Sequence, residues 1–290
     1  MNSQTMTDRT ASPTAPAADI KPGPADNPKN VVNSVVKAFS VLRAFTPAQM
    51  EMTVSEIAAI TGMDRGTTFR LIHTLVSLDY LRPVSVRKFR LTLKCLELGF
   101  LALSSQELWA HADPLLAGCV PDICDAASLG MLDGADVIYL RRVDQGLARH
   151  KVDRRPGRRV RAYGAALGHA ILAFLPEPQQ ILILESAERV KLSERTLTDL
   201  DALLKRLRQV RKQGYAVSDG ENAYGLRTIA VPVFDAGQQP IAGVSLTADA
   251  QRMSIEALIG LALPRALAIA AELNRAVRFS GGTIATSPSY

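Results

Sequence analysis

The hydrophobic pattern is most regular between Thr53 and Leu81. Apolar or small residues recur every three or four positions in two successive stretches, at Val54, Ile57, Ala58 and Thr61 and again at Thr68, Leu71, Ile72 and Leu75. This spacing predicts two amphipathic helices, each with one stripe to bury. Thr53 and Glu56 have the spacing of a capping box, and Gly62 allows a tight turn between the helices. The stretch is therefore predicted to be a helix-turn-helix.

The outward face of the second predicted helix is cationic and rich in hydrogen-bonding groups. Its residues are Arg65, Gly66, Thr67, Phe69, Arg70 and His73. A helix of this size fits the major groove of double-stranded DNA, where side chains of these types contact base edges and phosphates. We predict that it is a recognition helix. On this pattern alone, the alternative of an ordinary helical hairpin in a hydrophobic core stays open.

A helix and a hairpin are predicted on either side of this motif. Asn33 or Ser34 is expected to cap the helix, which carries a one-sided apolar stripe and ends before Pro47. The hairpin follows the motif, with strands at 80–84 and 88–91. In its second strand Phe89 and Leu91 are expected to point inward, and Lys88 and Arg90 outward.

The predicted hairpin is strongly basic. Arg82, Arg87, Lys88 and Arg90 all belong to it. A basic hairpin beside a helix-turn-helix is a wing, and wings contact phosphates, which supply affinity and register rather than sequence choice. A solvated hairpin without a ligand is the alternative.

Between residues 91 and 112 the apolar positions Leu93, Leu96, Phe100 and Leu103 alternate steps of three and four. This seam predicts a linker helix that packs on another helix, such as that of a partner subunit. Self-association suits a DNA-binding protein of this kind, because two recognition helices about 34 Å apart can contact the two half-sites of an operator.

The rest of the chain predicts an α+β domain with an antiparallel sheet. Strands at 128–132 and 137–142 flank Asp133-Gly134, a pair that favours a type I′ turn. Further strands are predicted at 228–234 and 240–248, and helices at 166–174, 198–213 and 255–278. A basic loop covers 149–161, and a polar loop covers 214–227; loops of the latter kind often form small-molecule sites on a rigid scaffold.

Composition supports this organisation. The length of 290 residues suits about two domains, and a net charge of +6 with a pI near 9.4 fits a polyanionic partner. No apolar run reaches the ~20 residues of a membrane span, and the first residues lack the apolar core of a signal peptide, so we expect a cytoplasmic protein without a membrane partner. Residues 1–30, rich in Pro, Ala, Ser and Thr, are predicted to be a disordered tail, and 279–290 a flexible one.

Candidate chemistry for catalysis or metal binding is sparse. Cys95, Cys119 and Cys124 form an odd set without a second pair of ligands, so neither disulfides nor a zinc site is expected. The motifs of serine hydrolases, zinc peptidases and nucleotide-binding loops are missing from the sequence. We therefore predict no catalytic residue, no metal and no cofactor. An enzyme with a DNA-binding appendage and a ligand-independent architectural DNA binder are the rival classes.

Several short motifs together resemble the IclR family of bacterial transcriptional regulators. They are Ser55 to Ala58, Thr61-Gly62, Arg70-Leu71, Phe89-Arg90-Leu91, Leu98-Gly99, Leu167-Gly168, Gly225-Leu226-Arg227 and Ala230 to Val233. The resemblance runs from about Val31 to Val277. It implies a winged helix-turn-helix domain at 31–92, a linker helix at 93–112 and a GAF-like α/β effector-binding domain at 113–278. It also implies a homodimer or a dimer of dimers.

Two departures from the family pattern bear on DNA reading. Asp64-Arg65-Gly66 stands where the family usually has proline, a basic residue and serine, and the wing turn lacks its usual glycine. These differences affect the operator sequence and the wing shape rather than DNA binding itself.

The resemblance further implies which residues contact an effector. They are the backbone of Ala166 and Leu167 together with the side chains of Ser218, Thr228, Ser245 and Thr247. Hydroxyls and helix-terminal amides suit a small carboxylic acid, and the family commonly regulates catabolic operons for aromatic or small organic acids.

Four positions near the implied site leave alternatives open. The family often has Asp at Ser218, so Asp219 beside it is an alternative acceptor. Arg161, where the family commonly has Pro, either reaches a carboxylate or faces water. The strand hydroxyls of Ser245 and Thr247 are alternatively ordinary sheet residues.

Overall fold

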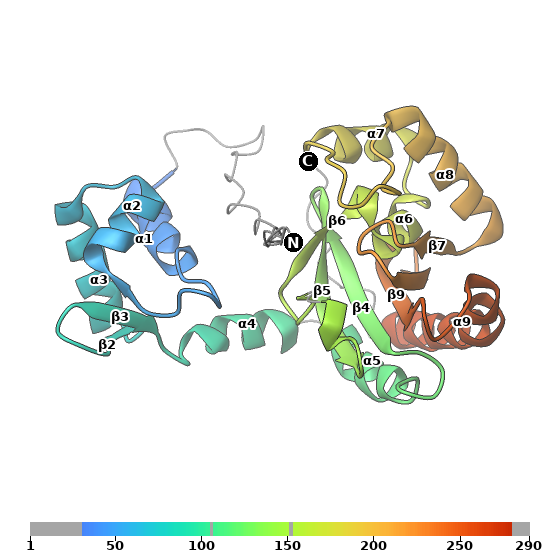
Figure 1. Cartoon of the computed structure of the whole chain (residues 1–290), viewed down its shortest axis with the longest axis horizontal. Helices are drawn as coiled ribbons and strands as arrows, with labels where there is room; N and C mark the ends of the chain where they lie inside the picture. The colour runs from blue at the N-terminus through green and yellow to red at the C-terminus, as the bar shows by residue number, and fades with distance from the viewer. Residues whose placement is uncertain (1–30, 105–106, 151–152, 280–290) are drawn as a thin grey trace, which may run out of the picture. The chain divides into compact units, whose positions relative to one another are not determined.

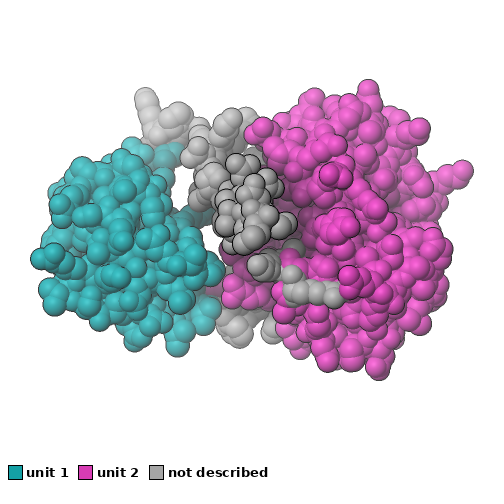
Figure 2. Space-filling view, in the orientation of Figure 1, with its two compact units in different colours: residues 1–98, 290 teal, residues 99–289 magenta. Residues whose placement is uncertain are grey.

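The computed structural model describes residues 31–104, 107–150 and 153–279. The predicted tail at 1–30 lies outside this part, and so does the predicted tail at 279–290 except for its first residue. That residue, Phe279, belongs to the last helix. The chain divides into two compact units after Leu98, shown in Figure 2. Among the described residues, no helix is long and apolar enough to cross a membrane.

The first unit is a three-helix domain with a small sheet. Its helices are α1 (Asn33–Arg43), α2 (Val54–Thr61) and α3 (Arg65–Ser77), and its strands are β1 (Met52–Thr53), β2 (Leu81–Pro83) and β3 (Lys88–Leu91). The sheet is antiparallel in the order β1-β3-β2. The predicted apolar stripes meet in one core, where Ile57, Ile72 and Leu81 are fully buried. This is the predicted winged helix-turn-helix, with β1 as an unpredicted third strand.

Local capping explains where these helices begin. The Thr53 backbone N–H donates to Glu56 (2.7 Å) and the Glu56 N–H to Thr53 Oγ1 (3.3 Å), so the predicted capping box is confirmed. Gly62 follows with φ +67°, as a left-handed helix end requires. The predicted cap of α1 is wrong, because Val32 occupies the N-cap without a side-chain bond and Asn33 is already helical.

Two helices follow the wing, α4 (Cys95–Ser104) and α5 (Glu107–Ala117). The stretch predicted as a linker helix, 93–112, overlaps both, and residues 105–106 between them lie outside the described part. α5 continues beyond the predicted end and contains Pro114. Since no partner subunit is present, the packing of this linker on a second copy stays a prediction.

The second unit is built on a six-stranded antiparallel sheet in the order β6-β5-β4-β9-β8-β7. The strands are β4 (Ala126–Asp133), β5 (Asp136–Asp144), β6 (Arg159–Arg161), β7 (Ala216–Asp219), β8 (Leu226–Phe234) and β9 (Pro240–Asp249). The helices are α6 (Ala166–Leu172), α7 (Glu177–Glu185), α8 (Leu200–Gln213) and α9 (Ile255–Phe279). Figure 1 shows α6, α7 and α8 on one side of the sheet and α5 and α9 on the other. The predicted α+β domain with an antiparallel sheet is confirmed.

Three local predictions in this unit are wrong. The polar loop 214–227 contains the edge strand β7, and the basic loop 149–161 ends in the edge strand β6. The central residues of the turn between β4 and β5 are Gly134 and Ala135. Gly134 has a positive φ (+59°), and Ala135 is not among the residues of positive φ in the described chain. A type I′ turn needs positive φ at both central positions, whereas a type II′ turn needs it at the first alone. The predicted type I′ turn is therefore wrong, and the φ values fit type II′.

Alternation along the strands divides the core between the two faces of the sheet. Leu129, Val244 and Leu246 pack with α5 and α9 on one face, whereas Ala216 and Ala230 belong to the cluster around α6 and α8 on the other. On the α6 face the sheet carries glycine, and a Cβ added at Gly243 would lie 3.0 Å from Leu167 Cδ2. Small sheet residues therefore let α6 approach closely.

Candidate DNA-binding surface and effector site

The helix α3 separates a buried face from an exposed one as predicted. Thr68, Ile72 and Leu75 are buried in the core of the first unit. The predicted DNA-binding residues Arg65, Gly66, Phe69, Arg70 and His73 are exposed, and Thr67 is half-buried. Phe69 is 51% exposed, so its ring is free to contact a thymine methyl group in the major groove.

The start of α3 explains why the unusual Asp64 and Gly66 occur together. Asp64 Oδ1 accepts the Thr67 backbone N–H at 2.8 Å, and this hydrogen bond holds the pKa of Asp64 below its ordinary value. A Cβ at Gly66 would lie 3.3 Å from the same oxygen. The acidic cap is therefore accommodated best by a glycine, and Arg65 is presented beside it in the first turn.

The wing presents positive charges that form no ion pair among the described residues. Arg82, Arg87, Lys88 and Arg90 are exposed, whereas Phe89 is buried. The turn is closed by the Val84 N–H, which donates to the Lys88 carbonyl at 2.9 Å. In the described ranges no carboxylate lies within 4.0 Å of these cations or of Arg65 and Arg70. Their charges are available to DNA phosphates.

An aromatic contact connects the recognition helix with the wing. The His73 ring lies 4.2 Å from the Phe69 ring and 6.2 Å from the Phe89 ring, centroid to centroid. His73 was predicted as a DNA contact, and the structure shows that it also packs between α3 and β3. The sequence did not indicate this bridge, because Phe89 is sixteen positions away and its side-chain direction depends on the sheet.

The predicted effector hydroxyls lie in two neighbouring cross-strand rows. Ser218, Thr228 and Thr247 are directly opposite one another across β7, β8 and β9, and the Thr228 and Thr247 hydroxyls are 3.0 Å apart. Ser245, two positions before Thr247, is opposite Ser128 on β4. Directly opposite residues share a face, so both rows lie on the α6 side.

The chain around α6 brings the remaining predicted contacts to the same face. A short 3-10 helix, Ala162–Gly164, runs into α6, so Ala166 and Leu167 begin the helix without a side-chain cap. Both residues are buried. In the described part of the chain, the hydroxyls of Ser218 and Ser245 have no side-chain hydrogen bond of their own. They are therefore free to bond a ligand.

The structure does not bring Asp219 to these rows. Because strand side chains alternate, Asp219 lies on the opposite face from Ser218, where it pairs with Arg195 (2.6 Å) and Arg227 (2.9 Å). Its proposed role as an alternative acceptor has no geometric support. Arg161 pairs with Asp136 at 3.2 Å, so it reaches a carboxylate of the protein itself.

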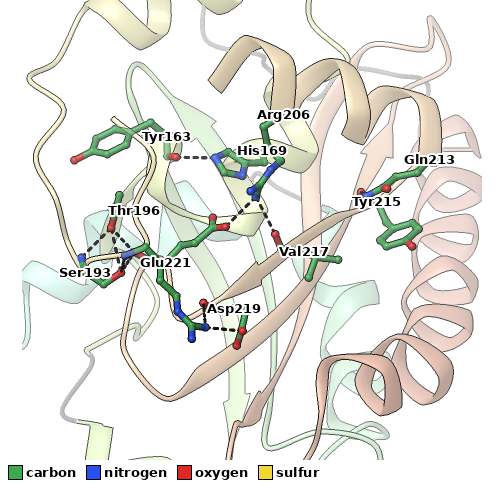
Figure 3. Close-up of polar contacts among 11 residues, drawn as sticks. Tyr163, His169, Ser193, Thr196, Arg206, Gln213, Tyr215, Val217, Asp219 and Glu221 are labelled. Atoms are coloured by element: carbon green, nitrogen blue, oxygen red, sulfur yellow. Dashed lines mark hydrogen bonds and ion pairs between the residues drawn. The ribbon is translucent and has the colours of Figure 1, made fainter. Parts of the chain in front are cut away.

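A buried network fixes the turn that follows β7 (Figure 3). Glu221 is 8% exposed and its carboxylate pairs with Arg206 at 2.9 Å. Its backbone carbonyl accepts from Thr196 Oγ1 (2.5 Å) and Ser193 Oγ (3.0 Å). Glu221 is therefore a buried, paired residue, and this turn is held from α8 and from 193–196.

A fully buried histidine lies next to this network. His169 Nε2 is 2.6 Å from the Tyr163 carbonyl oxygen, and burial lowers the pKa of His169. Its Nδ1 has no hydrogen-bond partner among the described residues. Burial therefore favours the neutral form of this α6 side chain.

Two of the three cysteines are core residues, and Cys95 is half-buried. Cys119 and Cys124 are buried and free, and burial raises the pKa of Cys124 to about 12. Among the described residues no three His, Cys, Asp or Glu side chains are grouped as metal ligands would be.

Comparison with known proteins gives matches to both units. Residues 34–85 match a family model described as the IclR helix-turn-helix domain, and residues 100–274 match one described as bacterial transcriptional regulator IclR C-terminal. The HTH-type transcriptional regulator KdgR of Escherichia coli K12 is 35% identical over 234 residues, covering 80% of this chain and 88% of KdgR.

Solved structures give the same result. The crystal structure of a transcriptional regulator from Rhodococcus sp. RHA1 has a TM-score of 0.73 at 32% identity, covering 84% of this chain and 98% of that one. The inducer-binding domain of PobR from Acinetobacter, a double mutant in complex with 3-hydroxybenzoic acid, has a TM-score of 0.51 at 28% identity. It covers 56% of this chain and 95% of the PobR domain.

Proposed function

Because this chain belongs to the IclR family of bacterial transcriptional regulators, we propose that a small organic acid controls its binding to a pseudo-palindromic operator. The chain is a DNA-binding regulator with a helix-turn-helix unit and a C-terminal ligand-binding unit. Its relatives are transcriptional regulators rather than enzymes. In our proposal it acts as a homodimer or a dimer of dimers and governs a catabolic operon.

The observation that carries the effector proposal is the pair of hydroxyl rows under α6. Ser218, Ser245 and Thr247 are buried, and buried hydroxyls normally find hydrogen-bond partners. Those of Ser218 and Ser245 have none within the described chain. A bound molecule with carboxylate or hydroxyl oxygens supplies them. The PobR domain in complex with 3-hydroxybenzoic acid makes an aromatic hydroxy acid a suitable first candidate.

Control of DNA binding requires that the effector distinguish two arrangements of the regulator. A ligand shifts such an equilibrium only by the difference between its affinities for the two states. We propose that the ligand acts on α6 and the sheet, and that the linker at 93–112 carries the effect to the recognition helices.

The double variant Ser245→Val/Thr247→Val tests this proposal. At Thr247 valine keeps the shape of the side chain and removes the hydroxyl, whereas at Ser245 it removes the hydroxyl and adds volume. Operator affinity would be measured by fluorescence anisotropy with and without 3-hydroxybenzoate and a panel of small carboxylates. We expect the variant to bind the operator like the wild type and to lose the response to the acid.

Ser186→Val is the matched control, because Ser186 is exposed at the end of α7 and far along the chain from both rows. A double variant that still responds normally would contradict the site. A wild-type protein whose operator affinity no acid changes would instead favour the ligand-independent architectural DNA binder.

A further inference from the structure

Two buried arginines of the second unit have no adequate counter-charge. Arg142 on β5 is 9% exposed and Arg154, in the loop after it, is 8% exposed. Arg142 has Asp144 at 3.5 Å, but that carboxylate is half exposed. For Arg154 the structure gives one polar partner, the side-chain carbonyl of Asn222 at 3.0 Å. Within the described ranges no carboxylate lies within 4.0 Å of Arg154.

The two guanidinium groups repel each other. Burial lowers the pKa of Arg142, and the nearby positive charge of Arg154 lowers it further. In the same loop Arg155 is exposed and Arg158 is half-buried, and both pair with Asp153. Arg142 has a half-exposed carboxylate as its counter-ion, and Arg154 has none among the described residues. Burying cations in this way is unfavourable, and an anionic ligand would supply the acceptor.

The side-chain amide of Asn222, next to Arg154, has a donor without a partner among the described residues. The Asn222 Oδ1 accepts from Arg154, while its Nδ2 is buried and has no partner among the described residues. Asn222 follows Glu221, which is fixed by Arg206, Thr196 and Ser193 (Figure 3). The donor is therefore held in place by a built turn.

The arginine pair is continuous with the hydroxyl rows. Arg142 is directly opposite Ser128, and its Nη1 donates to the Ser128 hydroxyl at 3.1 Å. Ser128 is in turn opposite Ser245 on β9. One cross-strand row therefore runs from a guanidinium to the hydroxyls of the proposed effector site, all on the α6 face.

We propose that Arg142 and Arg154 bind the anionic group of the ligand, with Asn222 as an additional donor. The ligand is a small carboxylate, and its remaining polar groups bond Ser245 and the neighbouring hydroxyls. This inference rests on the proposed function, since it places the charge of the same effector. It assigns the anion to side-chain guanidiniums of β5 and its following loop rather than to the start of α6.

Thermal denaturation without DNA tests the anion site directly. The wild type, Arg142→Met and Arg154→Met would be titrated with 3-hydroxybenzoate and, separately, with inorganic phosphate, in Tris–chloride buffer at constant ionic strength. We expect the wild-type melting temperature to rise saturably with 3-hydroxybenzoate, by about 3–5 °C at ten times the Kd. Both methionine variants should lose this rise. Arg208→Met is the control, because Arg208 is exposed and paired with Glu177 on the surface.

The phosphate arm identifies the kind of anion. A carboxylate ligand predicts a saturable shift with 3-hydroxybenzoate that exceeds the shift with phosphate. A larger shift with phosphate would overturn the carboxylate assignment. A wild type that neither anion stabilises, or methionine variants that keep the full shift, would overturn the anion site.

A second measurement does not depend on the probe. Without a bound anion, Arg154 is a buried charge that lacks a partner, so Arg154→Met should melt at or above the wild-type temperature. A clear loss of stability in the Tris–chloride buffer without added carboxylate or phosphate would contradict this. Since neither assay contains DNA, failure of the arginine site leaves the hydroxyl-row test of operator control to be decided separately.

Discussion

The charge of the wing gives a prediction that can be worked out from the structure. Lys88 on β3 is exposed and has no carboxylate within ion-pair distance in the described part of the chain. If it contacts one phosphate, Lys88→Ala removes one released counterion per half-site. Arg70, Arg87 and Arg90 are also exposed without a carboxylate partner, so each subunit of a dimer would make four phosphate contacts and the dimer eight. A plot of log affinity against log salt concentration should then have a slope of about −7.

For the dimer, Lys88→Ala should flatten that slope by about 1.8. Between 50 and 200 mM salt the factor by which operator affinity falls should therefore be about 12 times smaller for the variant than for the wild type. The assay is operator binding by fluorescence anisotropy over this range. An unrelated DNA should show the same change in slope, because phosphate contacts carry no sequence information.

Two variants serve as controls for this reasoning. Lys212→Ala removes one exposed positive charge from α8, far along the chain from the wing, and should leave the slope unchanged. Arg65→Ala should relax the preference at one base pair by about 1–3 kcal/mol, because Arg65 in the first turn of α3 is placed to contact a base edge. The division of roles would be refuted if Lys88→Ala reduced sequence preference as much as Arg65→Ala, or if its salt slope equalled that of the wild type.

Two further predictions concern the second unit. A Cβ at Gly168 would lie 2.1 Å from the Ala162 carbonyl oxygen, so Gly168→Ala should lower the free energy of unfolding, measured in urea, by at least about 2 kcal/mol. The control is Gly260→Ala in α9, where a Cβ meets open space and the free energy of unfolding should rise by about 0.5–1 kcal/mol. Equal effects of the two variants would contradict the close approach of α6. Burial lowers the folded-state pKa of His169, so below about pH 6.5 the unfolded chain binds a proton that the folded chain does not, and stability should fall with pH by up to about 1.4 kcal/mol per unit. His169→Gln should flatten this dependence between pH 6.5 and 5 in urea titrations, and an unchanged pH profile would show that another group causes it.

The DNA-binding unit was predictable from sequence because its signals are local. The capping box of Thr53 and Glu56 and the three-and-four spacing of the stripes depend on neighbours within one or two helical turns. β1 was missed because Met52–Thr53 is too short for any alternation to show. The cap of α1 was misplaced by a residue or two because Asn33 and Ser34 are both favourable cap types, yet the helix begins after Val32.

The arrangement of the proposed effector site could be predicted only in part, because its geometry is non-local. The alternation of Ser245 and Thr247 shows that they share a face, but the pairing of β4 with β9 decides that Ser128 and Arg142 join their row. Edge strands β6 and β7 form by pairing with β5 and β8 rather than through their own pattern. A run of arginines looks solvated in sequence, so nothing indicated that Arg154 is buried.

The sheet joins distant parts of the chain, since the Asp249 N–H donates to the Asp125 carboxylate across 124 residues. During translation, β9 reaches the ribosome exit long after the recognition helix and wing have been released. A newly made or prematurely terminated chain therefore contains a complete DNA-binding fold before the sensing face exists. A nonsense mutation after β4 should therefore yield a fragment that keeps the DNA-binding surface, does not respond to the proposed effector and competes with the full-length regulator.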